Sequence, residues 1–362
     1  MVRGKNLRNE NYKLTFIWEL DYTYEELEDI ISYFIDNSSS PITSIYFNNS
    51  NRGFGFTRRR FSIMNILSVI LAVILAPLFL GIVNQTKAFF GGRRGPGYLR
   101  LYKDLFKLVR KSCPRPMPST WIFDIAQSVS LASVIAASIV FPWSGVGIGS
   151  SIVSAVLFFY ILAVGRFFTV IGALDAGNAF EGMGASREMQ FSTLAEPIVF
   201  VILGLLVMLN GDVSLTSVLA GVSSETWRES IVALILVFGA FYAVFLLENC
   251  RVPFDDPETH LELTMIHEAM LLDVGGVDLA FALYGAALKF ELLAAFLVTM
   301  FVPQLSNPYL HLSVILGGVA LISILTGVVE SIMARVRFFK TPQMLLGALL
   351  MASLAVFFIA CF

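Results

Sequence analysis

The chain has 362 residues, of which 56% are hydrophobic and only 14% are charged, and its formal net charge is −2. A soluble domain has about 45–50% apolar and about 25% charged residues, so this composition indicates a membrane protein. No nucleic-acid partner is expected from such a charge. The three cysteines, Cys113, Cys250 and Cys361, are widely separated. Their spacing excludes a disulfide framework and any four-cysteine iron–sulfur or zinc centre made by this chain alone.

Two regions differ in composition. Residues 1–60 are rich in Asn, Ser, Tyr and Glu and contain no apolar run of spanning length, so they are expected to form a non-membrane N-terminal extension. Residues 61–362 are expected to form an all-α, polytopic membrane bundle of about eight helices, because a backbone in lipid must satisfy its own hydrogen bonds. The apolar runs cover residues 61–83, 121–141, 149–174, 195–210, 230–247, 277–302, 310–329 and 343–361.

The connecting segments predict the orientation. With eight spans, four of them fall on one side: 84–118, 175–194, 248–275 and 330–342. The first carries nine Lys and Arg residues against one acid, Asp104, and an excess of Lys and Arg marks the cytoplasmic side. The protein is therefore expected to be a multi-pass protein of the cytoplasmic (inner) membrane with its basic loops in the cytoplasm. Arg58–Arg60 disagree with the outer N-terminus that this topology requires.

The first of these segments contains a predicted surface helix. Apolar and basic side chains alternate with helical periodicity over residues 98–110, which indicates an amphipathic helix at the membrane surface. Anchoring to anionic lipid and docking of a cytoplasmic partner are both compatible with this pattern. The basic candidates for docking are Arg93, Arg94, Arg100, Lys103 and Lys107.

The segment from Glu248 to Ala269 is the richest in ionisable side chains. Asp256, Pro257 and Glu258 predict the start of a helix, with a cap, a proline at the first position and an acid in the first turn. That helix would place His260 and His267 on roughly one face. No second histidine follows His267-Glu268 at metalloprotease spacing, so no metal site is predicted. The many carboxylates beside one arginine, Arg251, favour a protonatable network.

Four further charges lie in or beside the apolar runs. Glu196 stands at the start of a span, Lys289 and Glu291 near the centre of the sixth, and Glu330 at the end of the seventh. An acid inside a span costs about 2.5–3.5 kcal/mol and is a functional candidate by default. Structural pairing between helices is the alternative explanation for these residues.

One long motif resembles a known family. It reads Glu248-x-x-Arg251-x-Pro253-Phe254-Asp255-x-Pro257-Glu258, followed by Glu262-Leu263. This pattern resembles subunit 1 of respiratory complex I. The fuller string through His260, Ile266, His267 and Glu268 more closely resembles the related membrane subunit of energy-converting group 4 NiFe hydrogenases, the formate hydrogenlyase subunit 4 family. The quinone-reducing branch usually has an acid where His260 stands and lacks the acid at Asp256. The resemblance covers about 64–362.

This resemblance implies a membrane anchor without cofactors of its own. Iron–sulfur clusters and, in hydrogenases, the NiFe centre would belong to a hydrogenase-like large subunit and an iron–sulfur small subunit, with antiporter-like membrane subunits beside them. Coupling roles are implied for Glu196, Glu248, Arg251, Asp255, Asp256, Glu258, Glu262 and Glu268. Lys289, Glu291 and Glu330 are added from burial alone, and His260 and His267 are added to the docking candidates.

Two other functions remain open from the sequence. One is a quinone-binding subunit of an NADH:quinone oxidoreductase, and the other is a secondary transporter. A transporter of the common kind is expected to show internal repeats or interrupted spans in matching halves, and neither is clear here. Independent catalysis is not expected, because the sequence has no phosphate loop, nucleophile motif or metal-ligand set.

The N-terminal conflict leads to the first prediction. Met64 lies just inside the first apolar run. The hypothesis is that Met64 is the natural start and that residues 1–63 arise from a misassigned upstream start; the alternative is that they form a genuine extension. A chain that begins at Met64 keeps about 20 residues of span. Mass spectrometry of the N-terminal peptide of the native protein tests this. A peptide from within residues 1–60 would contradict a natural start at Met64.

Overall fold

The computed structural model describes residues 54–145, 153–219, 231–255, 265–303, 305 and 307–361. Contacts divide the chain into two units, Met1–Thr57 and Arg58–Phe362, and nearly all described residues belong to the second. Most of the expected extension therefore lies outside the described residues. The described part of the second unit is helical, and one isolated bridge, Ser154 to Ser214, is its only β-type pairing.

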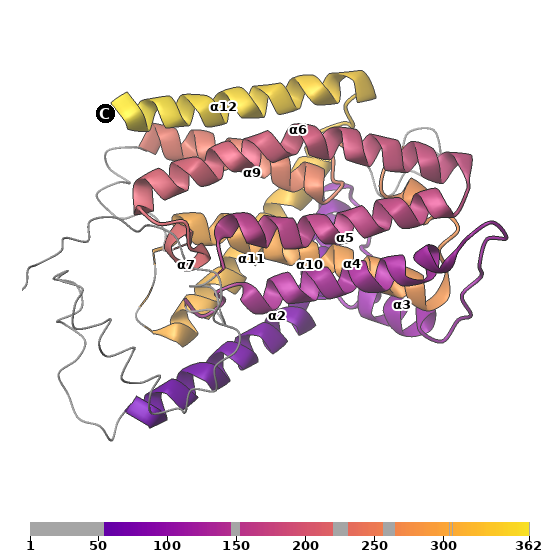
Figure 1. Cartoon of the computed structure of the whole chain (residues 1–362), viewed down its shortest axis with the longest axis horizontal. Helices are drawn as coiled ribbons and strands as arrows, with labels where there is room; N and C mark the ends of the chain where they lie inside the picture. Colours follow the sequence, from indigo (N-terminus) through magenta and orange to yellow (C-terminus); the bar gives the residue numbers. More distant parts are fainter. Residues whose placement is uncertain are drawn as a thin grey trace, which may run out of the picture. The chain divides into compact units, whose positions relative to one another are not determined.

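Eight of the helices are long and apolar enough to cross a membrane, which confirms the expected fold class. They are α2 (Phe54–Phe90), α4 (Trp121–Val140), α5 (Ala155–Asp175), α6 (Ala179–Asn210), α9 (Ile231–Glu248), α10 (Gly276–Phe301), α11 (Pro308–Ile332) and α12 (Thr341–Cys361). The shorter elements are α3 (Arg100–Leu108), α7 (Leu215–Val218), η2 (Glu268–Leu271) and η3 (Phe338–Lys340). Figure 1 shows α4, α5 and α6 running alongside one another, with α2 inclined to them.

Helix α6 corrects one part of the sequence prediction. The segment 175–194 was expected to be a loop and the span to start near residue 195, but the helix begins at Ala179. The side chain of Asn178 caps it by accepting a hydrogen bond from the Phe180 N–H. At 32 residues, α6 is about 48 Å long, well beyond a hydrocarbon core of about 30 Å. Its polar first half therefore extends past the apolar region, and hydropathy does not reveal it.

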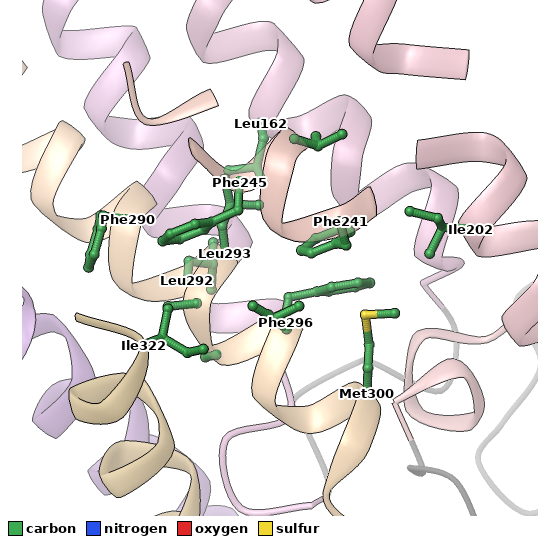
Figure 2. Packing of buried hydrophobic residues seen from close by; sticks show 14 of the residues in the cluster. Leu162, Ile202, Phe241, Phe245, Phe290, Leu292, Leu293, Phe296, Met300 and Ile322 are labelled. Atoms are coloured by element: carbon green, nitrogen blue, oxygen red, sulfur yellow. The ribbon is translucent and has the colours of Figure 1, made fainter. Parts of the chain in front are cut away.

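Helix α10 lies at the centre of the bundle. Of its apolar window, 72% is buried inside the protein, against 22% for α12. Aromatic rings from α9 and α10 fill the core around it: Phe241 stacks on Phe296 with centroids 5.2 Å apart, and Phe245 packs on Phe290 at 5.1 Å (Figure 2). Such pairs contribute about 0.5–1.5 kcal/mol beyond area burial. They fix the depth at which the charged residues of α9 and α10 face each other.

The predicted surface helix exists as α3, and it folds back along α2. Residues 91–97 form the turn, and a Cβ atom on Gly95 would overlap the side chain of Gln85. Further back, a Cβ atom on Gly81 would overlap the carbonyl oxygen of Tyr98. The backbone of the returning segment thus lies directly on α2. Helix α3 also contacts α10, so it is held between two spans.

This close approach predicts that Gly81 tolerates no side chain. Gly81→Ala forces the Tyr98 carbonyl away from α2 and should lower stability by about 1–3 kcal/mol, measured as a lower midpoint of thermal unfolding in mild detergent. Gly347, also inside a span, has nothing within 4 Å of an added Cβ. Gly347→Ala is the matched control and should change stability by less than about 0.5 kcal/mol. Equal effects of the two changes would contradict the contact.

Candidate functional site

Glu248, the last residue of α9, is the centre of a group of buried charges. One carboxylate oxygen accepts from Arg166 Nη1 of α5 at 2.5 Å, and the other accepts from Lys289 Nζ of α10 at 2.8 Å. Lys289 also donates to the Glu248 backbone carbonyl at 2.8 Å. The exposed fractions of these three side chains are 17%, 12% and 18%. One carboxylate therefore joins three helices.

Glu196 joins this group through the same arginine. Its Oε1 lies 3.1 Å from Arg166 Nη2, and its side chain is 54% exposed. Arg166 is 11 residues from the start of α5 and Glu196 is 14 residues from the end of α6. At about 1.5 Å per residue, both lie about 16–21 Å from those helix ends. We name Glu196, Arg166, Glu248 and Lys289 the deep cluster. Its depth makes each charge depend on the others, since lipid offers no solvation.

A second group lies at the end of the bundle that carries the basic segments. Glu330, at the end of α11, is completely buried, and its Oε1 accepts from Arg251 Nη1 at 3.3 Å. Its Oε2 lies 3.6 Å from Lys87 Nζ at the end of α2. Arg251 is 11% exposed and also faces the ring of Phe290 at 5.7 Å. These three side chains connect the ends of α2 and α11 with the segment that follows α9.

Asp255 forms a third group at the same end. Its Oδ2 accepts from the backbone N–H groups of Ile266 at 3.0 Å and His267 at 3.4 Å, and its Oδ1 pairs with Arg335 Nη2 at 3.0 Å. The carboxylate is 4% exposed. It therefore fastens the segment after α9 to the segment after α11.

A cavity of about 90 Å³ is lined by Arg166, Glu248 and Lys289 of the deep cluster and by Arg251. Glu188 of α6 lines it and accepts a long hydrogen bond of 4.0 Å from the Cys250 thiol. The volume fits about three waters at about 30 Å³ each. Burial raises the pKa of the Cys250 thiol well above its usual range, so it stays protonated. Burial and the nearby Lys289 lower the pKa of His267 to about 4, so this imidazole is neutral at physiological pH.

Several predicted residues lie apart from these groups. Both oxygens of Glu291 are buried and find no hydrogen-bond partner within the described residues. Glu268 lies partly exposed in η2, and His267 lines the cavity beside Arg251. The predicted helix through His267 is wrong at 265–267, which form a bend and turn held by Asp255. Four predicted residues fall outside the described residues: Asp256, Glu258, His260 and Glu262.

The basic docking candidates are exposed. Arg93 and Arg94 lie in the turn after α2, and Lys103 lies on α3. On the same helix, Asp104 pairs with Arg100 at 3.4 Å and with Lys107 at 3.8 Å. Their side chains are 64% and 72% exposed, so these pairs contribute little to stability. Their charge remains available to a partner or to lipid headgroups.

Sequence reasoning missed two members of the site. Arg166 lies inside the apolar run 149–174, and a cation within a span is a signal that could have identified it. Glu188 lies in the range predicted to be a loop and became visible only with the early start of α6. Among the described residues, no group of three or more His, Cys, Asp or Glu is arranged to hold a metal ion.

Comparison with known proteins gives consistent matches. A family model described as NADH dehydrogenase matches residues 63–361. Hydrogenase-4 component C of Escherichia coli (strain K12) is 30% identical over 290 residues, covering 76% of this chain and 89% of that protein. Formate hydrogenlyase subunit 4 of the same organism is 27% identical over 277 residues, covering 74% and 89%.

A solved structure shares the fold. It is the structure of the membrane-bound sulfane sulfur reductase (MBS), an archaeal respiratory membrane complex, and one of its chains matches with a TM-score of 0.71 at 18% identity. The match covers 82% of this chain and 98% of that chain.

The burial of Arg251 predicts a large cost for its removal. Arg251→Ala leaves the completely buried Glu330 without its closest partner and should destabilise the protein by about 3–5 kcal/mol. Arg100→Ala is the control, because Arg100 pairs with a half-exposed Asp104 and its loss should cost about 1 kcal/mol or less. Thermal unfolding in mild detergent measures both. Equal, small losses would show that Arg251 acts as a surface charge.

Proposed function

The chain belongs to the NADH dehydrogenase family, and on that basis we propose that it is the membrane-embedded anchor and coupling subunit of a hydrogenase-type, energy-converting complex. In this function it links a cytoplasmic redox module to ion translocation in the membrane. The similarity to Hydrogenase-4 component C and formate hydrogenlyase subunit 4 supports the hydrogenase type.

One observation carries the proposal. Buried carboxylates and cations follow one another from the basic end of the bundle into its interior, from Arg335 and Asp255 past Arg251 to the deep cluster. The cavity lined by the last two groups has room for water. Such a series of ionisable groups costs stability in a membrane and is typical of ion pathways.

The geometry suggests how a signal would travel along this series. Glu248 holds Arg166 with one oxygen and Lys289 with the other. A proton that binds Glu248 weakens both ion pairs at once and leaves the two cations free to seek other acceptors. Arg166 then shifts toward Glu196, and Lys289 toward Glu188, which interacts with it electrostatically across the cavity. The electrostatic change moves between helices without electron transfer in this chain.

The partners follow from the same reasoning. We place the basic end of the bundle in the cytoplasm, because excess Lys and Arg marks that side. The turn after α2 and helix α3 would contact a hydrogenase-like large subunit and an iron–sulfur small subunit, which hold the iron–sulfur clusters and NiFe centre. Antiporter-like membrane subunits would lie against the lateral faces. The half-exposed Glu196 is suited to such a protein neighbour, since lipid solvates a carboxylate poorly.

The test combines purification and activity. The tagged chain, isolated from membranes in mild detergent, should retain a large subunit with metal-binding cysteines and an iron–sulfur subunit, identified by mass spectrometry. Glu248→Gln should keep these subunits and the electron-transfer rate with a reduced viologen dye, but should lower ion accumulation in reconstituted vesicles by at least tenfold, because the shared carboxylate is lost.

Asp212→Asn is the matched control for that variant. Asp212 is an exposed acid before α7, and among the described residues its side chain bonds its neighbours Val213 and Ser214. This change should leave subunit content and ion accumulation unaltered. A wild-type chain that purifies alone and well folded would exclude the anchor function, and normal ion accumulation in Glu248→Gln would exclude the role of the deep cluster.

A further inference from the structure

Helix α2 has a break in its hydrogen-bond ladder at Pro77. Proline has no N–H, so the carbonyl of Val73, four residues earlier, loses its helical partner. This position lies well inside the first span, where an unsatisfied carbonyl costs several kilocalories per mole. The hydroxyl of Tyr284 from α10 satisfies it, donating to Val73 O at 2.6 Å.

A second tyrosine hydrogen-bonds the next backbone carbonyl of α2. The hydroxyl of Tyr102 from α3 donates to the carbonyl of Ile74 at 2.5 Å. A proline inside a helix kinks it, and the two phenols bond two consecutive carbonyls, those of Val73 and Ile74, just before this point. Ile74 lies 16 residues before the end of α2, about 24 Å along the axis, and Tyr102 reaches it because the segment after α2 folds back along that helix.

Tyr284 lies on α10, the helix that carries Lys289 and Glu291, and Tyr102 of α3 is close to it. Tyr284 and Glu291 are seven residues apart on α10 and so share a face. Glu291 interacts electrostatically with both Tyr102 and Tyr284, and the two phenols interact with each other. Burial, with a smaller contribution from Glu291, raises the pKa of Tyr102, so its hydroxyl remains a donor. Lys289 of the deep cluster is two residues from Glu291.

We propose that Tyr102 and Tyr284 are positioning residues that clamp the α2 kink between α3 and α10, so that displacement of α3 is transmitted to the helix bearing Lys289 and Glu291. This inference rests on the proposed function, in which α3 belongs to the surface that contacts the redox module. A load on α3 pulls the Tyr102 hydroxyl from the kink, the kink changes angle, and Tyr284 carries the change to α10. The two hydroxyls are the only side-chain hydrogen bonds to α2 carbonyls from other helices among the described residues.

Hydrogen exchange of the full complex tests the clamp. Tyr102→Phe removes the hydrogen bond to the Ile74 carbonyl and so loosens α2 around Pro77, and peptides covering residues 74–82 should exchange about two- to tenfold faster. In reconstituted vesicles the same variant should transfer electrons from a reduced viologen dye at the normal rate but move at least threefold fewer ions per electron. Tyr98→Phe is the control, because Tyr98 is 51% exposed and precedes α3 on the same returning segment. It should behave as the wild type.

Tyr284→Phe repeats the measurement from α10 and leaves α3 intact, which keeps the test valid if the first variant assembles poorly. Faster exchange at 74–82 together with fewer ions per electron supports the clamp. Unchanged exchange, or changed exchange with an unchanged ion ratio, overturns it. Failure of the proposed function is distinguishable, because the wild-type chain would then lack redox subunits, while exchange of the full chain in nanodiscs would still report on the kink.

Discussion

The ion pairs of Glu248 are the interaction on which the rest of the bundle depends. A span tolerates a buried charge only when a partner meets it at the same depth. Glu248 meets this requirement for Arg166 and Lys289 at once, so α5, α9 and α10 must keep a fixed axial register. The aromatic pairs between α9 and α10 hold the same register with apolar contacts. Packing and electrostatics thus specify one arrangement of the central helices.

Much of the architecture could be predicted from local sequence. Apolar run length identified the eight spans, and helical periodicity identified α3, because both signals are contained within one element. The first half of α6 was missed, since a polar helix beyond the hydrocarbon has no apolar signal. Arg166 was overlooked because its neighbours are apolar. The motif around Arg251 and Asp255 predicted a network of charges, and the structure brings its acids Glu248 and Asp255 to buried partners.

The pairing of the site residues could not be predicted. Arg166 is 82 residues from Glu248, Lys289 is 41 residues from it, and Arg251 is 79 residues from Glu330. No local pattern encodes which charges meet over such separations. The same limit applies to Glu291, which resembles Lys289 in position along α10 but faces the tyrosines of the kink. Only the rotation of α10 in the bundle decides which residue faces which partner.

The fold-back of α3 on α2 has a consequence for the order of synthesis. The contacts at Gly95, Tyr98 and Tyr102 all reach residues less than 30 positions earlier, so this hairpin can close while the ribosome is still making α4. Arg166 has no such early partner, because Glu196 emerges 30 residues later and Glu248 82 residues later. Helix α5 therefore enters the membrane with its arginine unneutralised until α6 supplies Glu196, and the pair with the more deeply buried Glu248 forms only when α9 arrives.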